Sequence, residues 1–446
     1  MNMKFVAVGV VVILAAAGAG AAVLLMKSDK ADEDTILTHR LLVMGNVCSD
    51  DTLDSNDVTV LEALIEGKET TIHVAGNDID LTDANLKKYA DVNQDKNIDT
   101  NDVDALKKIL NNEASTLYYE NAKGVITSVK VPINNLLVMF RRVGTTVAMV
   151  GASDMVKGFI SDLGPSGNYG FLGFTGEIVQ SGSEPNFEKI KEMNKTFEST
   201  GGVTLIADAT GSAANLEEGC GPGIDVVRMP VTEMGKSENG VVTLGYLLAY
   251  KNAKHDQIHD KLNTWIEWND GAKKKIEDAV KKLSDSDKKT CIVGMYNASA
   301  STATVNVRGS GVSEYEYSVM CGGNNIGANG SYTESEFSEF LLAKNPEYAF
   351  VMQQEVFLLK DKIPATQTYN DLKETISSNY HGKIGVFSQF FGTGPGYVLS
   401  LMYYASVLIP ELKDTFDITK EYQYFMGTLV GNEELAKVTA FVPITE

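Results

Sequence analysis

The chain has 446 residues, 43% of them hydrophobic, and only ten prolines, so it can bury more than one core and we expect two or three domains. Its formal net charge of −20 at pH 7 argues against nucleic acid as a partner, because phosphate binding requires clustered Lys and Arg. The four cysteines form neither a CxxC pair nor a Cys/His metal spacing: Cys48, Cys220, Cys291 and Cys321. We expect packed thiols, with a Cys291–Cys321 bridge as the alternative.

An apolar run occupies residues 5–26, between Lys4 and Lys27. About 20 apolar residues span a bilayer, whereas the core of a signal peptide has about 7–15. The run therefore predicts an uncleaved membrane anchor within residues 1–30, although its AAAGAGAA tract leaves a cleaved signal as the alternative. Under either interpretation the rest of the chain is exported to the outer face of the cell membrane.

Residues 91–102 have the sequence DVNQDKNIDTND and are followed by the helix-like segment VDALKKIL. Oxygen-bearing side chains occupy positions 1, 3, 5, 9 and 12 of this twelve-residue loop, and position 7 can offer its backbone carbonyl, an arrangement that wraps a calcium ion. The predicted ligands are Asp91, Asn93, Asp95, Asn97, Asp99 and Asp102. The alternative is that these Asp residues only cap a helix.

A related loop lies upstream at residues 46–57, before the segment VTVLEALIEG. Its candidate ligands are Asn46, Asp50, Thr52, Asp54 and Asp57. The two loop–helix units, in each of which the loop ends on Asp, resemble a dockerin, a calcium-loaded module that binds cohesin domains. The resemblance implies a small all-α module at residues 37–115. We expect calcium mainly in the second loop, because Cys48 places a soft sulfur where calcium prefers oxygen, although position 6 is not the usual Gly in either loop (Asp51 and Lys96).

Apolar residues recur at three- and four-residue steps through residues 241–283, with Lys, Asp and Glu between them. This period predicts one long amphipathic helix, and residues 269–271 are the expected position of any bend. Short apolar runs bounded by turn residues lie at residues 136–140, 203–208 and 225–229 before it and at residues 291–296, 348–353 and 383–389 after it. These runs indicate parallel strands in two βα sandwich lobes, joined by the helix and separated by a cleft.

Four further segments, in the order GTTVAMVGASDMVKGF, GSEPNFEKIKEMN, CGGNNIGA and SEFLLAKNPEYAFV, together with this helix resemble the substrate-binding proteins of ABC importers for metal chelates. The resemblance implies a periplasmic-binding-protein-like α/β fold, with an N-lobe at residues 118–240, a linking helix at 241–284 and a C-lobe at 285–446. It also implies capture of a ferric siderophore, haem or cobalamin for an ABC permease. The family's permease-docking glutamates match Glu188 and Glu339, whose alternative role, as first-turn helix residues, is to stabilise a helix end.

In open α/β layers, ligands lie beyond the carboxyl ends of the strands, so the loops that follow the apolar runs are the expected binding site. Aromatic, amide and Arg groups in these loops suit a bulky, oxygen-rich chelate. The candidates are Arg141, Arg142, Tyr169, Phe171, Tyr296, Asn297, Gln353, Gln354, Gln389, Phe390 and Phe391. The alternative for each is an ordinary rim residue, and the two arginines have surface ion pairing as the alternative to bidentate contacts with the ligand.

Catalysis has little support in the sequence, which contains no GxSxG turn and no GxxxxGK loop. His255 and His259 have i,i+4 spacing, but the adjacent Lys254 and Asp256 indicate a solvated helix face rather than a metal site. We therefore expect an exported, membrane-tethered solute-binding protein and not an enzyme. The alternative is a surface scaffold or adhesion protein that uses the bilobal fold as a spacer, and burial of the strand-end aromatic and Arg residues in a closed interlobe contact would favour it.

Overall fold

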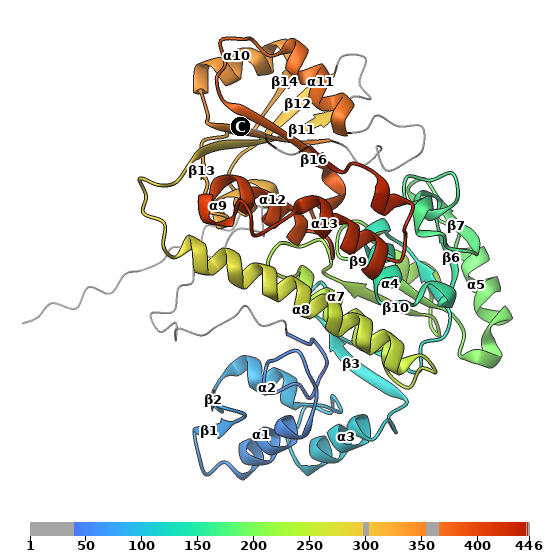
Figure 1. Cartoon of the computed structure of the whole chain (residues 1–446). Coiled ribbons are helices and arrows are strands. Elements are labelled where there is room, and N and C mark those ends of the chain that lie inside the picture. The colour runs from blue at the N-terminus through green and yellow to red at the C-terminus, as the bar shows by residue number, and fades with distance from the viewer. Residues whose placement is uncertain (1–39, 298–302, 354–364, 443, 445–446) are drawn as a thin grey trace, which may run out of the picture.

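The computed structural model describes residues 40–297, 303–353, 365–442 and 444. A small N-terminal module, an N-lobe and a C-lobe are arranged around the long helix α8 (His255–Val280) (Figure 1). The apolar run at residues 5–26 lies outside the described residues. Within the described ranges, no helix combines the length and the apolar character needed to cross a membrane.

The N-terminal module contains three helices and a hairpin, so the prediction of an all-α module was wrong. Its elements are α1 (Ser55–Glu66), β1 (Thr71–Val74), β2 (Asn77–Asp80), α2 (Ala84–Ala90) and α3 (Thr100–Leu110). The two hairpin strands are joined by Ala75 and Gly76, both with positive φ (51° and 86°). Two such residues form the turn that matches the right-handed twist of paired strands.

A second hairpin, β3 (Thr116–Glu120) and β4 (Ile126–Lys130), joins the module to the N-lobe. The start of the described chain runs beside β3, because Met44 N donates to Tyr118 O (2.9 Å) and Glu120 N donates to Leu42 O (2.8 Å). On the N-lobe side, the hairpin is held by Ala122 N, which donates to Arg228 O at 3.0 Å. One continuous hydrophobic core therefore extends from the module into both lobes.

The N-lobe contains a six-stranded sheet in the order β10-β9-β5-β6-β7-β8, in which only β8 is antiparallel to its neighbour. Its strands are β5 (Leu136–Val138), β6 (Val156–Ile160), β7 (Glu177–Ser181), β8 (Glu184–Pro185), β9 (Thr204–Asp208) and β10 (Asp225–Met229), and its helices are α4 (Arg141–Met149), α5 (Phe187–Thr196) and α6 (Leu216–Cys220). The predicted parallel strands of this lobe are confirmed. The carboxyl ends of β5, β6, β9 and β10 consequently meet at one edge of the sheet.

The C-lobe contains a seven-stranded sheet in the order β14-β12-β11-β15-β16-β17, with β13 also paired to β11. Its strands are β11 (Thr290–Asn297), β12 (Thr304–Arg308), β13 (Asn324–Asn325), β14 (Gly330–Thr333), β15 (Tyr348–Gln353), β16 (Lys383–Ser388) and β17 (Phe441–Val442). The predicted strands β11, β15 and β16 are mutually parallel, whereas β12, β14 and β17 pair antiparallel with β11, β12 and β16, respectively.

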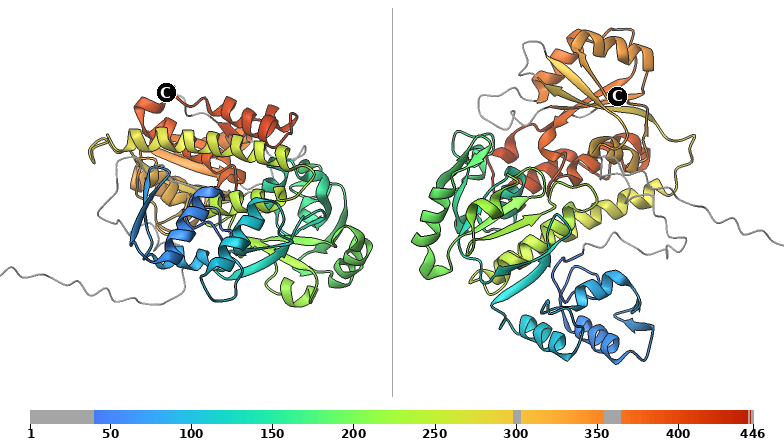
Figure 2. Two further views of the ribbon diagram at one scale, coloured as in Figure 1. Left: turned by 90° about the horizontal axis from the view of Figure 1, so that it is seen from below. Right: turned by 180° about the vertical axis from the view of Figure 1, so that it is seen from behind.

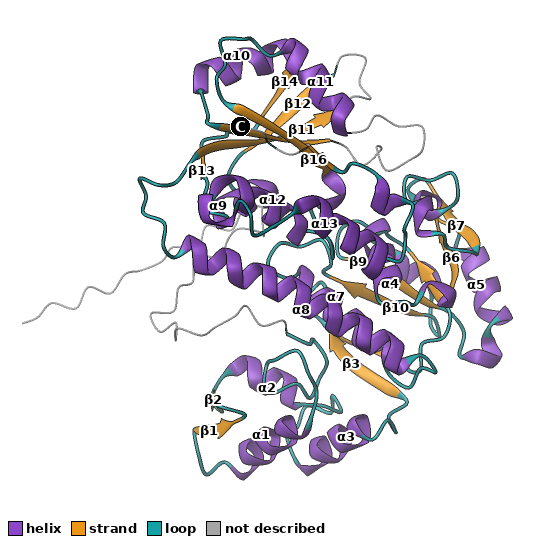
Figure 3. Cartoon of the chain, in the orientation of Figure 1, coloured by secondary structure: helices purple, strands orange, loops and turns teal. Residues whose placement is uncertain are grey.

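Helices cover both faces of the C-lobe sheet (Figure 3). They are α9 (Ser313–Met320), α10 (Glu334–Lys344), α11 (Ala365–Thr375), α12 (Val398–Leu408), α13 (Ile418–Gln423) and a π-helix at Tyr424–Leu429. Along β15, Phe350 packs against Tyr404 of α12 with ring centroids 4.8 Å apart, whereas the adjacent Val351 joins the separate core beneath α10 and α11. The strand is therefore apolar on both faces, as a strand covered by helices on both sides requires.

The predicted single helix at residues 241–283 consists of two helices, α7 (Ser237–Ala249) and α8, so this prediction was wrong. The chain leaves the helical conformation at Tyr250 (ψ 120°) and Lys251 (φ 55°). Two side chains of the connection bind backbone oxygens of distant segments: Tyr250 Oη donates to Ile109 O (3.1 Å) and Asn252 Nδ2 donates to Ile133 O (2.9 Å). Helix α8 itself continues through Gly271 without a break.

Both helices lie between the module and the C-lobe in Figure 1 and in the rear view of Figure 2. Helix α8 contacts the C-lobe through Trp265, whose Nε1 donates to Pro395 O at 2.8 Å, and through Trp268, which stacks on Phe425 at 5.6 Å. It contacts the N-lobe at the turn after α4, where a Cβ added to Gly151 would lie 3.0 Å from the side chain of Lys261. Helix α8 thus packs against both lobes along its length.

Candidate interlobe binding site

The first turn of α4 places two arginines at the carboxyl end of β5. Arg141 is about one-third exposed, and its Nη1 lies 3.4 Å from Asp162 Oδ2. Its guanidinium carbon is 5.7 Å from the centre of the Phe140 ring and 5.9 Å from that of Tyr169. A helix N-terminus already has a positive potential, so two guanidinium groups there make this edge of the N-lobe attractive to anions.

Arg142 is buried in the contact between the lobes and is 5% exposed. Its Nη2 donates to Gln389 O at 2.9 Å and its Nη1 donates to Phe390 O. These acceptors belong to a 3-10 turn that follows β16 and begins where Ser388 Oγ accepts from Phe390 N (2.9 Å). The guanidinium group of one lobe therefore binds the backbone of the other.

Three aromatic rings close the contact beside Arg142. The ring centroids of Tyr169, Phe171 and Phe390 are 5.5–5.6 Å apart in every pairing. The same N-lobe loop is also held by Asn432, whose Nδ2 donates to Phe171 O at 2.7 Å. Tyr169 and Phe390 are each 1% exposed, so the rings lie within a packed interface.

The remaining predicted ligand residues are distributed differently. Tyr296 is buried on the other face of the C-lobe sheet, where its Oη donates to Glu334 Oε1 of α10 at 2.7 Å. Phe391 belongs to the C-lobe core, with its ring 5.2 Å from that of Phe441. Asn297 and Gln353 end the adjacent strands β11 and β15, and Gln354 lies outside the described residues. The structure thus brings Arg141, Arg142, Tyr169, Phe171, Gln389 and Phe390 together. Phe391 contacts this group from the C-lobe core, with its ring 4.9 Å from that of Phe390, and Tyr296 lies apart from it on the other face of the sheet.

A buried polar cluster next to this contact was not predicted from the sequence. Glu238 of α7 accepts from Asn269 Nδ2 (2.8 Å), from Lys273 Nζ (2.6 Å to Oε2) and from Tyr397 Oη. The side chains of Lys273 and Glu238 are 7% and 14% exposed. Burial and the charge of Glu238 raise the pKa of Tyr397 well above its usual value. In the sequence, Lys273 is one of three consecutive lysines and resembles any solvated lysine on a helix.

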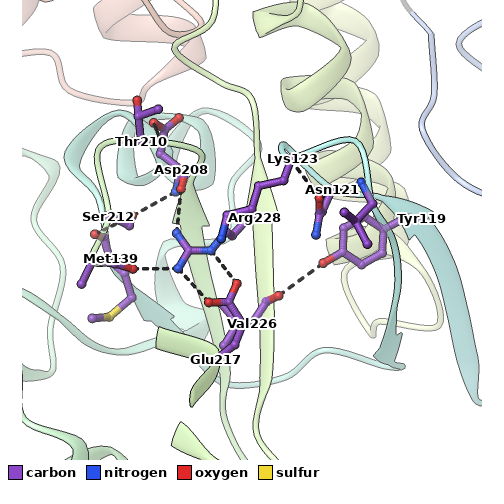
Figure 4. Close-up of polar contacts among 12 residues, drawn as sticks. Tyr119, Asn121, Lys123, Met139, Asp208, Thr210, Ser212, Glu217, Val226 and Arg228 are labelled. Carbon is purple, nitrogen blue, oxygen red and sulfur yellow. Dashed lines mark hydrogen bonds and ion pairs between the residues drawn. The ribbon is translucent and has the colours of Figure 1, made fainter. Parts of the chain in front are cut away.

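A second unpredicted cluster lies at the carboxyl ends of β9 and β10 (Figure 4). Arg228 is fully buried; its Nε donates to Glu217 Oε1 (2.5 Å) and its Nη1 to Asp208 O (3.1 Å). The carboxylate of Asp208 accepts from Thr232 Oγ1 (2.9 Å) and from Gly211 N (3.1 Å). Arg228 is thus paired with Glu217, neutral donors satisfy the Asp208 carboxylate, and the cluster fixes the loop after β9.

The second calcium-type loop, residues 91–102, connects α2 to α3. Lys96 occupies position 6 with φ 74°, the left-handed conformation for which such loops usually use Gly. Asp91 accepts from Asp95 N (3.0 Å) and Lys96 N (3.0 Å), and Asp102 accepts from Val92 N (2.7 Å). The predicted donors are all oxygen, which suits calcium. In the described part of the chain, however, no three His, Cys, Asp or Glu side chains are grouped so that they could hold a metal ion.

The first loop, residues 46–57, is built from internal hydrogen bonds. Asn46 is fully buried, and its Nδ2 donates to Leu41 O (2.8 Å) and to Asp50 O (2.7 Å). Asp57 accepts from Cys48 N (2.9 Å). The four cysteines are free, three of them buried, so the Cys291–Cys321 bridge is not formed.

The other candidate residues lie on the surface. His255 and His259 stack with ring centroids 5.8 Å apart on the exposed face of α8. Glu188 is exposed in the first turn of α5, as predicted. Glu339 is exposed too, but its predicted place in a first helical turn was wrong, because the capping box of Thr333 and Glu336 starts α10 earlier in the chain.

No family model and no curated protein matches the sequence. The fold does match solved structures. A periplasmic solute-binding protein from Veillonella parvula is 15% identical with a TM-score of 0.52, and the match covers 73% of this chain and 97% of that one. The TroA-like periplasmic binding protein FepB from the same organism is 12% identical with a TM-score of 0.53, over 74% and 99% of the two chains. The two lobes described here therefore have the fold of a periplasmic solute-binding protein.

Proposed function

We propose that this chain is an extracytoplasmic solute-binding protein that captures a metal chelate between its lobes and delivers it to an ABC permease. The observation that carries the proposal is the meeting of Arg141, Arg142 and three aromatic rings where the carboxyl ends of the two sheets face each other. Guanidinium groups hold carboxylates or phosphates bidentately, and aromatic rings cover flat or apolar surfaces. A ferric siderophore, haem or cobalamin combines both kinds of group.

Binding rather than catalysis follows from the same side chains. A guanidinium group stays charged at every accessible pH and a phenylalanine ring has no exchangeable proton, so Arg141, Arg142, Phe171 and Phe390 hold a ligand without transferring protons. Ligand entry requires the lobes to separate at Arg142, whose bonds to Gln389 O and Phe390 O are then replaced by bonds to the ligand. Arg141, already partly exposed, is the first contact.

The test is equilibrium dialysis of the purified chain against haem, cobalamin and ferric siderophores. A hydrogen bond to a charged group is worth about 1.5–3 kcal/mol, so Arg142→Gln should weaken binding about tenfold or more. Arg308→Gln is the matched control, because Arg308 lies on β12 with its Nη2 near Met295 Sδ (3.3 Å), away from the aromatic contact. Equal affinity of both variants and the native chain would contradict the proposed site.

A second candidate function, a surface scaffold that uses the lobes as a spacer, is favoured by one observation. Arg142, Tyr169 and Phe390 are buried in a closed interlobe contact, which is the feature expected of a spacer. The two functions differ in solution, because a spacer keeps this contact protected whether or not solutes are added. If no chelate in the dialysis panel binds the native chain, the scaffold function is preferred.

The proposal extends to the N-terminal part of the chain. Residues 5–26 would tether the chain to the outer face of the membrane, and the N-terminal module would bind calcium at residues 91–102 and a cohesin-type partner. The twelve-residue path of that loop and its oxygen donors support the calcium part. Cleavage or retention of residues 1–30 in the exported protein, read by N-terminal sequencing, tests the tether.

A further inference from the structure

Two adjacent residues at the start of α7 bind different parts of the molecule. Asn239 contacts the module, since its Oδ1 accepts from Arg40 N at 3.1 Å. One turn later, the fully buried Thr243 contacts the module again, since its Oγ1 accepts from Leu42 N at 2.9 Å. Glu238, in contrast, contacts α8 and the C-lobe through Lys273 and Tyr397. The first turns of α7 therefore touch both the module and the interlobe region.

On the module side, the segment at residues 40–46 connects α7 to both loops. The Arg40 guanidinium carbon lies 3.8 Å above the centre of the Tyr89 ring, and Gly45 N donates to Tyr89 O at 2.8 Å. Tyr89 lies in α2, immediately before the second loop. Asn46, the first residue of the first loop, is tied back to the same segment through Leu41 O. A displacement of either loop therefore moves the residues that α7 holds.

On the lobe side, the connection ends at the interlobe contact itself. Tyr397, the partner of Glu238, lies three residues after Gly394. Gly394 lies beside Arg142, because a Cβ added to it would be in ordinary van der Waals contact with Arg142 Cδ, at 3.5 Å. Trp265 of α8 donates to Pro395 O, in one of the two residues between Gly394 and Tyr397. The position of Tyr397 is thus linked to the residues that close the lobes.

We propose that α7 couples the small module to the interlobe contact, so that loosening of the module favours separation of the lobes and separation of the lobes loosens the module. The module is then a regulatory part of the binding domain and not only a docking appendage. A coupling free energy acts equally in both directions, which makes the proposal testable from either end. The test therefore measures the coupling between the two regions directly.

The experiment is hydrogen–deuterium exchange of the whole 446-residue chain in detergent micelles, without solute. Thr243→Val keeps the shape of the side chain but removes the acceptor of Leu42 N. Relative to the native chain, we expect amide exchange at residues 389–397 to be at least about fivefold faster, in addition to faster exchange at residues 41–46. Lys236→Ala, at the same end of α7 with an exposed side chain paired to Glu233, is the control and should leave both segments unchanged.

The reciprocal variant is Glu238→Gln, which weakens the bond to Lys273 and should accelerate exchange at residues 41–46 by a similar factor. In the double variant, exchange should be accelerated by less than the product of the two single-variant factors. Either substitution alone already releases the shared connection through α7, so the second adds little. Faster exchange confined to the neighbourhood of each substitution would overturn the proposal. If Thr243→Val does not fold, Asn239→Ala replaces it. Because the exchange experiment uses no solute, its outcome is independent of the dialysis result. The coupling can be absent in a chain that binds a chelate, and present in a chain that binds none.

Discussion

At the scale of single residues, the N-lobe shows how a buried charge obtains its hydrogen-bond partners. Arg228 has no exposed surface, but its Nη2 alone donates to Ala213 O (2.7 Å) and Glu217 Oε2 (2.9 Å). Burial acts to raise the pKa of Glu217, but the hydrogen bonds and charge of Arg228 lower it overall. An unpaired guanidinium group in this position would be strongly destabilising.

Glu217→Gln should therefore lower the free energy of unfolding by about 1–2 kcal/mol at pH 7, less than for a fully buried pair because Glu217 is half exposed. A carboxyl group whose pKa is lowered by folding stabilises the fold above its unfolded pKa, and this stability is lost as pH falls through the folded value. The difference from the native chain should thus shrink below about pH 4.5, the ordinary pKa of Glu. Denaturation at several pH values, with the exposed neighbour Glu218→Gln as control, measures this. A difference that stays constant with pH would contradict it.

At the scale of elements, the second calcium-type loop should determine the stability of the module. Its carboxylates repel one another without a cation, so calcium binding should be linked to folding. Calcium at a hundredfold excess over its Kd would add about 2.7 kcal/mol, and a chelator or Asp95→Ala should remove that gain. Asp78→Ala, on the exposed hairpin, is the control. Unchanged melting and amide exchange of residues 41–112 on adding calcium would exclude the loop as a site.

For the two exposed glutamates on α5 and α10, substitution should affect uptake rather than stability. Glu188 lies at the positive end of its helix, an interaction worth about 0.3–1 kcal/mol, but Glu339 lies beyond the first turn, where that effect fades. If both dock to Arg pockets of a permease, the double Gln variant should keep solute affinity and lose most uptake. Uptake in cells with the cognate permease, compared with Glu192→Gln on α5, measures this. Normal uptake by the double variant would exclude the docking role.

At the scale of the whole molecule, α8 is a stiff connection packed against both lobes. Lys261 Nζ donates to Leu429 O at 3.2 Å, which adds to the contacts of Trp265 and Trp268. We therefore expect a solute to change the radius of gyration, about 22 Å for a compact chain of this length, by less than about 1 Å. Small-angle X-ray scattering with and without a bound chelate measures the change. A larger change would show that the link at Tyr250 acts as a hinge.

The sequence by itself determined those features that depend on neighbours a few residues apart. The helical period of α8, the apolar runs of β5, β9, β11, β15 and β16, and the oxygen spacing at residues 91–102 were all readable, because each is a local repeat. The same local reasoning joined α7 to α8, since the period continues across Tyr250 and Lys251.

Only the tertiary structure decided which side chains are buried together. Arg142 is separated from Phe390 by 248 residues and Leu42 from Thr243 by 201, and no local pattern marks such pairs. The same holds for Glu238 and Lys273, which resemble solvated charges until the lobes enclose them. Burial depends on the packing of distant segments, so the closed interlobe contact and the docking of the module on α7 could be found only in the folded chain.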